Sequence, residues 1–258
     1  MQFTNSRDYI IPFIEDHIDM SKRLDVLEIG SGEAGVLKAF TELGHRCVGI
    51  ELSPTKTEIA RNFMTEELAD GRITLMAKNI YDVDIEKDFK SNFDLIILKD
   101  VIEHIHDQKK FMSFLHKFLK VDGKIFFGFP PWQMPFGGHQ QVANSKVLSA
   151  MPYYHMLPRQ IYKTVLETFG ESPQKVNTML EIKDTGISIE RFEKIVREEN
   201  YNIVKKYTYL INPIYKYKFG LTPRKQVGLV ASIPVLRNFL STCVYYLIDY
   251  QHSKVKNQ

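Results

Sequence analysis

The stretch that decides the fold is Val26-Leu27-Glu28-Ile29-Gly30-Ser31-Gly32-Glu33-Ala34-Gly35. An apolar run that ends in glycines and leads into a helical pattern over 34–43 predicts a strand, a tight turn and a helix. Glycines in such a turn let the backbone approach a ligand closely, and the first N–H groups of the helix point toward that ligand. The stretch therefore predicts a ligand site between a strand and a helix.

Outward from this stretch, short apolar runs alternate with patterns of helical spacing. This alternation is typical of a parallel sheet with helices on both faces. Ser53-Pro54 opens the helix after the second strand, because a proline in the first turn lacks only an N–H that would have no helical partner. We therefore predict an α/β fold with a Rossmann-like, doubly wound, mostly parallel sheet. The predicted strands are 24–29, 47–50, 72–76, 93–98 and 123–129, and the helices between them are 34–43, 54–69 and 107–119.

The alternation stops after the fifth strand. Residues 130–187 are rich in proline, glycine, aromatic residues and methionine, with at least one amphipathic helix expected, at 158–169. So long an excursion predicts a lid over the site or a small subdomain. A helix at 188–200 and strands at 201–211 and 241–248 then follow. The predicted division is a main domain of residues 1–129 and 188–258, interrupted by a substrate-side insertion of residues 130–187.

Composition restricts the function classes. The chain has 258 residues, of which 44% are hydrophobic and 25% charged, as in ordinary globular proteins. Its net charge of +3 is dispersed and does not predict a nucleic-acid partner. Cys47 and Cys243 stand in apolar runs and are expected to be reduced core residues. Charges throughout 1–23 argue against a signal peptide, and the apolar stretch 227–250 is broken by proline and arginine, so we expect a cytoplasmic protein with no transmembrane segment.

The glycines alone leave two cofactor classes open. Gly30, Gly32 and Gly35 have the G-x-G-x-x-G spacing of dinucleotide-binding proteins, so an NAD-dependent oxidoreductase is one alternative. The second class uses S-adenosylmethionine, and Glu28 favours it. A carboxylate beside the turn would repel the diphosphate of a dinucleotide but can hold the ammonium group of the methionine moiety. Glu51, at the end of the second strand, suits the ribose hydroxyls of either cofactor. The balance favours S-adenosylmethionine. A second alternative is a non-catalytic protein that retains the cofactor fold as a scaffold, against which the intact Glu28 and Glu51 argue.

Further segments bring the chain close to a known family. As a set they resemble class I S-adenosylmethionine-dependent methyltransferases, above all a branch that methylates small molecules and includes ubiquinone-pathway O-methyltransferases. The resemblance covers roughly residues 20–130, with weaker similarity at 188–212. It implies the seven-stranded sheet of that class and methyl transfer to a small-molecule, glycan or lipid-linked acceptor, with oxygen as the favoured target. The segments are Glu28-x-Gly30-x-Gly32, Gly49-Ile50-Glu51-Leu52-Ser53-Pro54, Asn79-Ile80 and Phe93-Asp94-Leu95-Ile96-Ile97.

The resemblance also implies a set of cofactor-binding residues. Two positions depart from the family pattern: Ala34 stands where many members have a third glycine, and Asn79 replaces a common aspartate. The first departure predicts a slightly reshaped loop, and the second keeps hydrogen bonding but removes a charge. The implied residues are Glu28, Gly30, Ser31 and Gly32 for the methionine part, Glu51 for the ribose, Leu52, Asn79 and Ile80 for the adenine, and Lys99 and Asp100 for the floor of the site.

Histidines are the candidates for the chemistry. Methyl transfer from a sulfonium is an in-line displacement, so the protein mainly positions the acceptor and excludes water. A hydroxyl acceptor must also lose a proton, which favours a nearby histidine or carboxylate. The candidate catalytic residues are His139, beyond the fifth strand, and His104, after the fourth, with His155 as a third. The alternative for each is a structural role in ordering a turn.

A divalent metal is a further alternative. Asp100-x-x-Glu103-His104 resembles the acid-x-x-Glu-His arrangement of metal-assisted O-methyltransferases, and His139 would complete a set of four ligands. Such a metal would acidify the acceptor hydroxyl. Because the first acid is aspartate rather than glutamate, the sequence does not assign a metal and leaves Asp100, Glu103, His104 and His139 as candidates only.

Two surface features concern the acceptor. The aromatic residues of 130–187 suit an apolar or sugar-ring acceptor, or they form the core of the insertion itself. Basic and aromatic residues interleave in Tyr215-Lys216-Tyr217-Lys218, followed by Arg224-Lys225. This pattern suits a phosphorylated or lipid-linked substrate and a peripheral membrane contact, or else it is a solvated basic face. The oligomeric state stays open.

Overall fold

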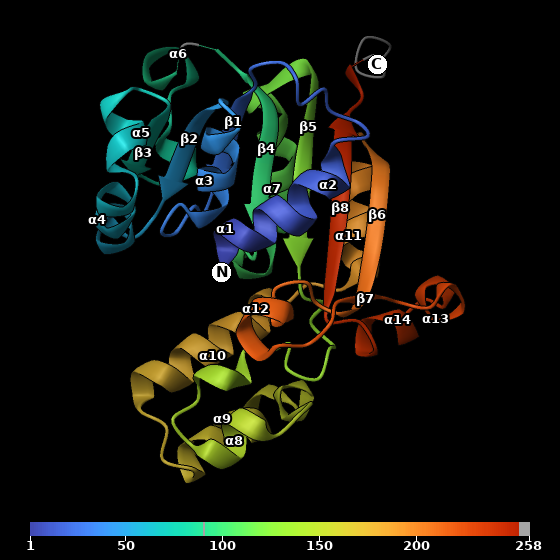
Figure 1. Cartoon of the computed structure of the whole chain (residues 1–258). Helices are drawn as coiled ribbons and strands as arrows, with labels where there is room; N and C mark the ends of the chain where they lie inside the picture. Colours follow the sequence, from blue (N-terminus) through green and yellow to red (C-terminus); the bar gives the residue numbers. More distant parts are fainter. Residues whose placement is uncertain (90, 253–258) are drawn as a thin grey trace.

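The computed structural model describes residues 1–89 and 91–252. In this part of the chain, strands form one sheet in the order β3-β2-β1-β4-β5-β8-β6-β7 (Figure 1). Strands β1 to β5 are parallel to one another, whereas β8 runs antiparallel to both β5 and β6. The strands are β1 Asp25–Ile29, β2 Arg46–Glu51, β3 Ile73–Ala77, β4 Phe93–Lys99, β5 Leu119–Phe129, β6 Tyr201–Ile211, β7 Arg224–Lys225 and β8 Cys243–Tyr250.

This sheet confirms the predicted α/β fold. The seven predicted strands correspond to β1–β6 and β8, and β7 is an additional two-residue strand paired with the end of β6. The strand order reverses between β1 and β4. In open α/β sheets, ligands bind beyond the carboxyl ends of the strands at such a switch point. The glycine turn follows β1 at that point.

Three predicted boundaries were wrong. The helix expected at 54–69 is two helices, α4 Pro54–Phe63 and α5 Thr65–Ala69, because Met64 leaves the helical region (φ −111°) while its side chain is fully buried. The helix expected at 107–119 ends earlier, as α7 Gln108–Leu115. Strand β5 begins at Leu119 rather than at residue 123, because Leu119 pairs with Phe93 across an irregularity in the β4–β5 ladder.

Helices cover both faces of the sheet. Because successive strand residues point to opposite faces, Ile96 and Leu98 join the core under α7 and α11 Ile189–Glu198, whereas Leu95 and Ile97 join the other core. The second face is covered by α3 Gly35–Glu42 and by an N-terminal helical stretch. That stretch, which the sequence did not predict, is α1 Gln2–Asn5, the π-helical turn Ser6–Ile10 and α2 Ile11–Ile14.

The two cysteines are free and buried, as predicted. Burial raises the pKa of both thiols, Cys47 and Cys243, so they are inert core residues. Within residues 1–89 and 91–252, no helix combines the length and apolar composition needed to cross a membrane. The apolar stretch 227–250 instead contains the short helices α13 Gly228–Ser232 and α14 Leu236–Phe239, followed by β8.

The insertion forms a helical layer beyond the carboxyl ends of the parallel strands (Figure 1). Its helices are α8 Lys146–Ala150, α9 Arg159–Thr168 and α10 Pro173–Thr185; the sequence predicted α9 alone. They bury a small core of their own, and α12 Tyr215–Phe219 lies between them and the sheet (Figure 1). The insertion's role as a lid stays a prediction. Its core residues are Leu148, Tyr154, Tyr162, Leu166, Val176, Met179 and Leu180.

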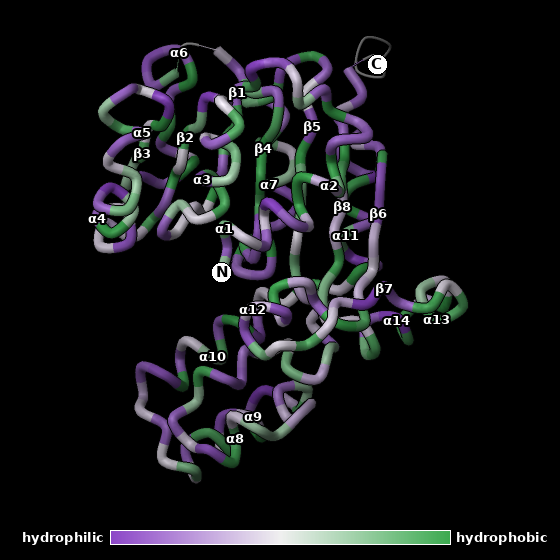
Figure 2. Tube along the Cα trace, in the orientation of Figure 1, coloured by the Kyte–Doolittle hydropathy of each residue, from purple (hydrophilic) through white to green (hydrophobic). Residues whose placement is uncertain are grey.

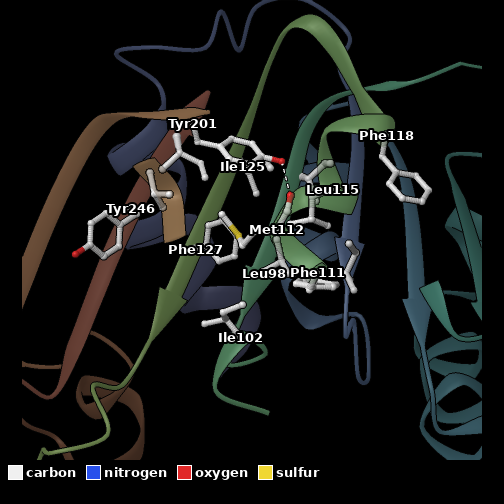
Figure 3. Packing of buried hydrophobic residues seen from close by; sticks show 14 of the residues in the cluster. Leu98, Ile102, Phe111, Met112, Leu115, Phe118, Ile125, Phe127, Tyr201 and Tyr246 are labelled. Atoms are coloured by element: carbon white, nitrogen blue, oxygen red, sulfur yellow. Dashed lines mark hydrogen bonds between the residues drawn. The ribbon is translucent and has the colours of Figure 1, made fainter. Parts of the chain in front are cut away.

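One hydrogen bond joins the core under α7 to the edge of the sheet. The buried Tyr201 hydroxyl donates to the Met112 carbonyl over 2.8 Å (Figure 3). We expect Tyr201→Phe to lower the free energy of unfolding by about 1 kcal/mol in urea titrations, since one net hydrogen bond is lost. Tyr250→Phe is the matched control, because the half-buried Tyr250 ring packs on Tyr201 but its hydroxyl has no partner in the described residues. Equal effects of the two variants would contradict this role.

Candidate active site

The turn after β1 has left-handed backbone at alternate residues. Gly30 and Gly32 have φ values of 73° and 52°, and Ala34 has φ 59°. A Cβ atom at Gly30 would lie 2.5 Å from Cγ2 of Val101, so glycine is required there for space as well as for conformation. Ala34 has the left-handed conformation that glycine adopts without strain. For alanine this conformation costs about 1 kcal/mol, because its Cβ atom crowds the backbone.

Glu51 ties this turn to the next loop. One of its carboxylate oxygens accepts the N–H of Gly32 and the other accepts the N–H of Ser53, each over 2.9 Å. Ser53 in turn begins α4, where its hydroxyl accepts the N–H of Lys56. The carboxylate is therefore held at the ends of β1 and β2.

Glu28 is a buried acid with an unsatisfied oxygen. Its residue surface is 2% exposed, and Oε2 has no hydrogen-bond partner in the described residues. Burial raises the pKa of Glu28 well above its usual range; the Lys99 ammonium opposes this shift and the Glu51 carboxylate adds to it. A cation placed beside this oxygen would relieve both the missing hydrogen bond and the burial of the charge.

Two cavities meet at the glycine turn. The first, of about 560 Å³, is lined by the methionine-side candidates, by Lys99 and by the N-terminal residues Met1, Gln2 and Phe3. The second, of about 380 Å³, is lined by the ribose and adenine candidates and by His104. Gly30 lines both. The predicted residues Glu28, Gly30, Ser31, Gly32 and Lys99 thus line the first cavity, and Gly30, Glu51, Leu52, Asn79 and Ile80 line the second.

Two predicted cofactor residues have partners within the protein. Asp100 lines neither cavity; its carboxylate forms an ion pair with the buried Lys99 ammonium, and its backbone is left-handed with φ 57°. Burial disfavours the charged ammonium, but Asp100, together with the nearby Cys243 and Glu103, outweighs that effect and the pKa of Lys99 is raised. Asn79 accepts the N–H of Tyr81 through Oδ1 over 3.1 Å. Asn79 therefore has a turn-forming role whether or not it contacts a ligand.

Three of the four candidate metal ligands lie together. Ligand atoms of Glu103, His104 and His139 all lie within 4.8 Å of one another, and the two imidazole ring centres are 5.1 Å apart. Asp100 is not a member of this group. Both oxygens of Glu103 are buried without a hydrogen-bond partner in the described residues, and burial, with the nearby Asp100 charge, raises the pKa of Glu103. This orphaned carboxylate between two histidines fits a divalent cation.

Both histidines of this group are held neutral. Burial lowers the pKa of His104 to about 4, with a further contribution from His139. Burial also lowers the pKa of His139. An uncharged imidazole can accept a proton or donate a lone pair to a metal, so the pair is available for either role at neutral pH.

His155 has a structural role. Its Nε2 lies 2.8 Å from the Trp132 carbonyl and its Nδ1 lies 2.6 Å from Nε2 of Gln140, so both ring nitrogens are engaged. The ring is fully buried. The Trp132 carbonyl can only accept, which fixes the proton on Nε2 and leaves Nδ1 to accept from Gln140. His155 therefore anchors the insertion, and the structure favours the turn-ordering alternative over catalysis.

Sequence reasoning missed two parts of the site. The N-terminal residues Met1, Gln2 and Phe3 line the first cavity, and no motif marks them. Tyr215, grouped in the sequence with a basic surface run, lies close enough to Lys99 and Asp100 to interact with their charges; burial is the main reason that its pKa is raised to about 12. The only sequence signal was the i, i+4 spacing of Tyr215 and Phe219, whose rings pack at 5.2 Å.

Comparison with known proteins identifies the family. The family described as "Methyltransferase domain" matches residues 8–168, so the chain belongs to it. Together with the curated relatives, this match places the chain in the class I S-adenosylmethionine-dependent methyltransferase family, as the motifs predicted, and favours this family over the NAD-dependent alternative.

The curated relatives match in part of their length. The chain is 30% identical over 115 residues to a ubiquinone biosynthesis O-methyltransferase of Idiomarina loihiensis, covering 45% of this chain and 46% of that one. It is 28% identical over 106 residues to the protein of that name from Bartonella quintana, covering 41% and 40%. The matched region thus spans less than half the length of these relatives.

Solved structures agree on the fold. A putative sarcosine dimethylglycine methyltransferase from Galdieria sulphuraria superposes with a TM-score of 0.59 at 12% identity, covering 95% of this chain and 85% of that one. Magnesium protoporphyrin IX methyltransferase from Synechocystis, solved with bound S-adenosylhomocysteine, gives 0.56 at 13% identity, covering 97% and 83%. Identities this low show the fold alone.

The environment of His155 predicts an acid-sensitive insertion. Burial lowers the pKa of His155 to about 4. The unfolded chain takes up a proton near pH 6.5 that the folded protein does not, so this residue's contribution to stability is lost as the pH falls from about 6.5 toward 4. We expect an NMR titration of the His155 ring to show a midpoint near pH 4, with His155→Gln identifying the signal. A midpoint near 6.5 would show that the ring is not buried as described.

Proposed function

We propose that this methyltransferase transfers the methyl group of S-adenosylmethionine to an oxygen of an apolar small-molecule or lipid-linked acceptor. The observation that carries the proposal is the pair of cavities that share Gly30, with the buried acid Glu28 lining the first and Glu51, held by two backbone N–H groups, lining the second. A cofactor with an amino-acid group at one end and a nucleoside at the other would place one end in each cavity, on either side of Gly30.

The chain's own residues account for each part of that cofactor. Glu28 has an unsatisfied buried oxygen for the ammonium of the methionine group. Glu51, fixed by two backbone N–H groups, presents its remaining lone pairs to the ribose hydroxyls. Leu52, which is 70% exposed, and Ile80 offer apolar surface to the adenine in the second cavity. S-adenosylmethionine, when bound, supplies a methyl group on a positively charged sulfur, which is transferred by in-line displacement.

The acceptor side is formed by His104 and His139. His104 follows β4 and His139 follows β5, beyond the carboxyl ends of these two parallel strands, and their ring centres lie 5.1 Å apart. Neutral imidazoles there can accept the proton that a hydroxyl acceptor loses. Tyr215 closes the same region near Lys99 and Asp100. We assign the insertion, residues 130–187, the role of excluding water from the acceptor.

A metal-assisted form of this reaction is favoured by one observation. Glu103 is a buried carboxylate without a partner among the described residues, yet it lies within reach of His104 and His139. These three residues would hold a divalent cation, which would lower the pKa of an acceptor hydroxyl. In this form the histidines are ligands, whereas without a metal they accept the proton directly.

The cofactor assignment is tested at Glu51. We expect Glu51→Gln to weaken the binding of S-adenosylhomocysteine by at least tenfold in calorimetric titrations, because hydrogen bonds to a charged acceptor contribute about 1.5–3 kcal/mol each. Glu58→Gln is the matched control: this exposed carboxylate on α4 pairs only with Arg61 on its own helix. If S-adenosylhomocysteine showed no saturable binding to the wild-type protein, the cofactor assignment would be overturned. If Glu51→Gln bound it with unchanged affinity, Glu51 would not be the ribose ligand.

The metal assignment is tested by melting temperature. We expect Mn²⁺ or Zn²⁺ to raise the melting temperature of the wild-type protein, reversibly with EDTA, and to leave that of Glu103→Gln and His139→Ala unchanged. His106→Ala is the control, because His106 is exposed and pairs with Glu181 outside the group. EDTA should reduce turnover without changing affinity for S-adenosylhomocysteine. Full activity in excess chelator, with no thermal shift, would leave His104 and His139 as proton acceptors.

A further inference from the structure

We propose that residues 210–240 dock the protein on bilayers that contain anionic lipid. The docking surface consists of exposed apolar side chains, Phe219, Leu221, Val227, Leu229 and Val235, together with the cations Lys216, Lys218, Arg224 and Lys225. It deepens the proposed function, because it rests on the assignment of an apolar or lipid-linked acceptor to the same site.

The apolar side chains of this surface are held away from the core. Leu229 is 74% exposed and Val227 is 64% exposed, and α13, which carries Leu229, buries none of its residues. In Figure 1, α13 projects beyond the edge of the sheet next to β7, and Figure 2 shows hydrophobic residues along it. Apolar residues gathered on a projection of this kind are typical of surfaces that another apolar phase covers.

The charge of the surface selects the kind of partner. From residue 200 to residue 248 the sequence contains seven lysines and arginines and no aspartate or glutamate. Lys205, Lys206 and Arg237 form ion pairs with acids of the main domain. Lys216, Lys218, Arg224 and Lys225 form none with the described residues, so four cations without an acidic partner there lie on α12 and β7, the elements that precede α13. Basic residues beside exposed apolar ones match an anionic lipid surface, which attracts lysine and arginine and accepts apolar side chains.

The base of the projection is firmly attached. Glu190 on α11 accepts the N–H of Val235 and pairs with Arg237, while the buried Asn238 accepts the N–H of Ile189. Val235 has φ 67°, which a β-branched residue adopts only when its surroundings enforce it. The exposed apolar residues are therefore presented from a fixed support.

The docking surface adjoins the acceptor side of the site. It begins at α12, whose Tyr215 lies near Lys99 and Asp100. The hydroxyl of Tyr153, in the insertion, donates to the carbonyl of Phe239 at the end of α14 over 3.3 Å. Attachment to a bilayer would therefore bring the opening of the site to the phase in which an apolar acceptor dissolves.

Co-sedimentation of the full chain with vesicles tests the proposal. We expect binding to vesicles of phosphatidylglycerol and phosphatidylcholine, at least tenfold weaker binding to phosphatidylcholine alone, and a strong reduction in 0.5 M NaCl. Leu229→Asp and the double change Arg224→Glu, Lys225→Glu should each weaken binding at least tenfold. Val121→Asp is the apolar control, with the same 74% exposure, at the start of β5 at the opposite end of the sheet. Lys22→Glu with Arg23→Glu is the charge control, as an adjacent exposed pair before β1.

The outcomes separate this proposal from the cofactor assignment. All variants should bind S-adenosylhomocysteine like the wild type, which also shows that they fold. If the wild-type protein binds S-adenosylhomocysteine but not anionic vesicles, the docking proposal is overturned and the cofactor assignment stands. Equal losses in Leu229→Asp and Val121→Asp would also overturn it. A wild-type dimer in sedimentation velocity that Leu229→Asp dissociates would assign the surface to a second copy of the chain instead.

Discussion

The site depends on one carboxylate that accepts hydrogen bonds from two loops. Glu51 ends β2 and accepts the N–H of Gly32 from the turn after β1 and the N–H of Ser53 before α4. The two loops meet where the strand order reverses, and without a shared acceptor their N–H groups would depend on water or ligand. By fixing the turn, the same carboxylate determines where the two cavities join. A ligand that spans both cavities therefore meets a site already assembled.

Buried charge is the second constraint. Glu28 and Glu103 each have buried oxygens without partners in the described residues, an arrangement that costs free energy in the empty protein. Lys99, fully enclosed and paired with Asp100, does not hydrogen-bond to either acid. In the proposed function these two carboxylates would bind two separate positive groups. An ammonium beside Glu28 and a cation beside Glu103 would satisfy them independently.

The sequence predicted the first half of the fold better than the second, for physical reasons. Buried parallel strands such as β4 Phe93–Lys99 are continuous apolar runs. The turn after β1 can be recognised because its left-handed backbone favours glycine. The approach of His139 to His104 could be proposed only through family resemblance, since 34 residues separate them in the sequence. The positions of Tyr215 and of the N-terminal helix beside the site depend on contacts between segments that are far apart in the sequence. No local sequence pattern predicts such contacts. Helix boundaries failed at Met64, where burial of one side chain outweighed helical continuity.

Strain is concentrated at the same end of the sheet. Ala34, Asp100 and His139 all have left-handed backbone without being glycine, and each follows the carboxyl end of a parallel strand. Such conformations persist only where surrounding contacts enforce them. The opposite end of the sheet is joined by ordinary ion pairs, such as Lys120 with Asp25 and Asp94. A left-handed residue there is Asn200, before β6, and asparagine adopts this conformation more readily than most residues. Asp100 pairs with Lys99, and the His139 ring lies 5.1 Å from that of His104, so two of the strained residues contact groups that the proposed function uses. In that proposal a fixed arrangement favours in-line transfer, because small errors in alignment raise its barrier steeply.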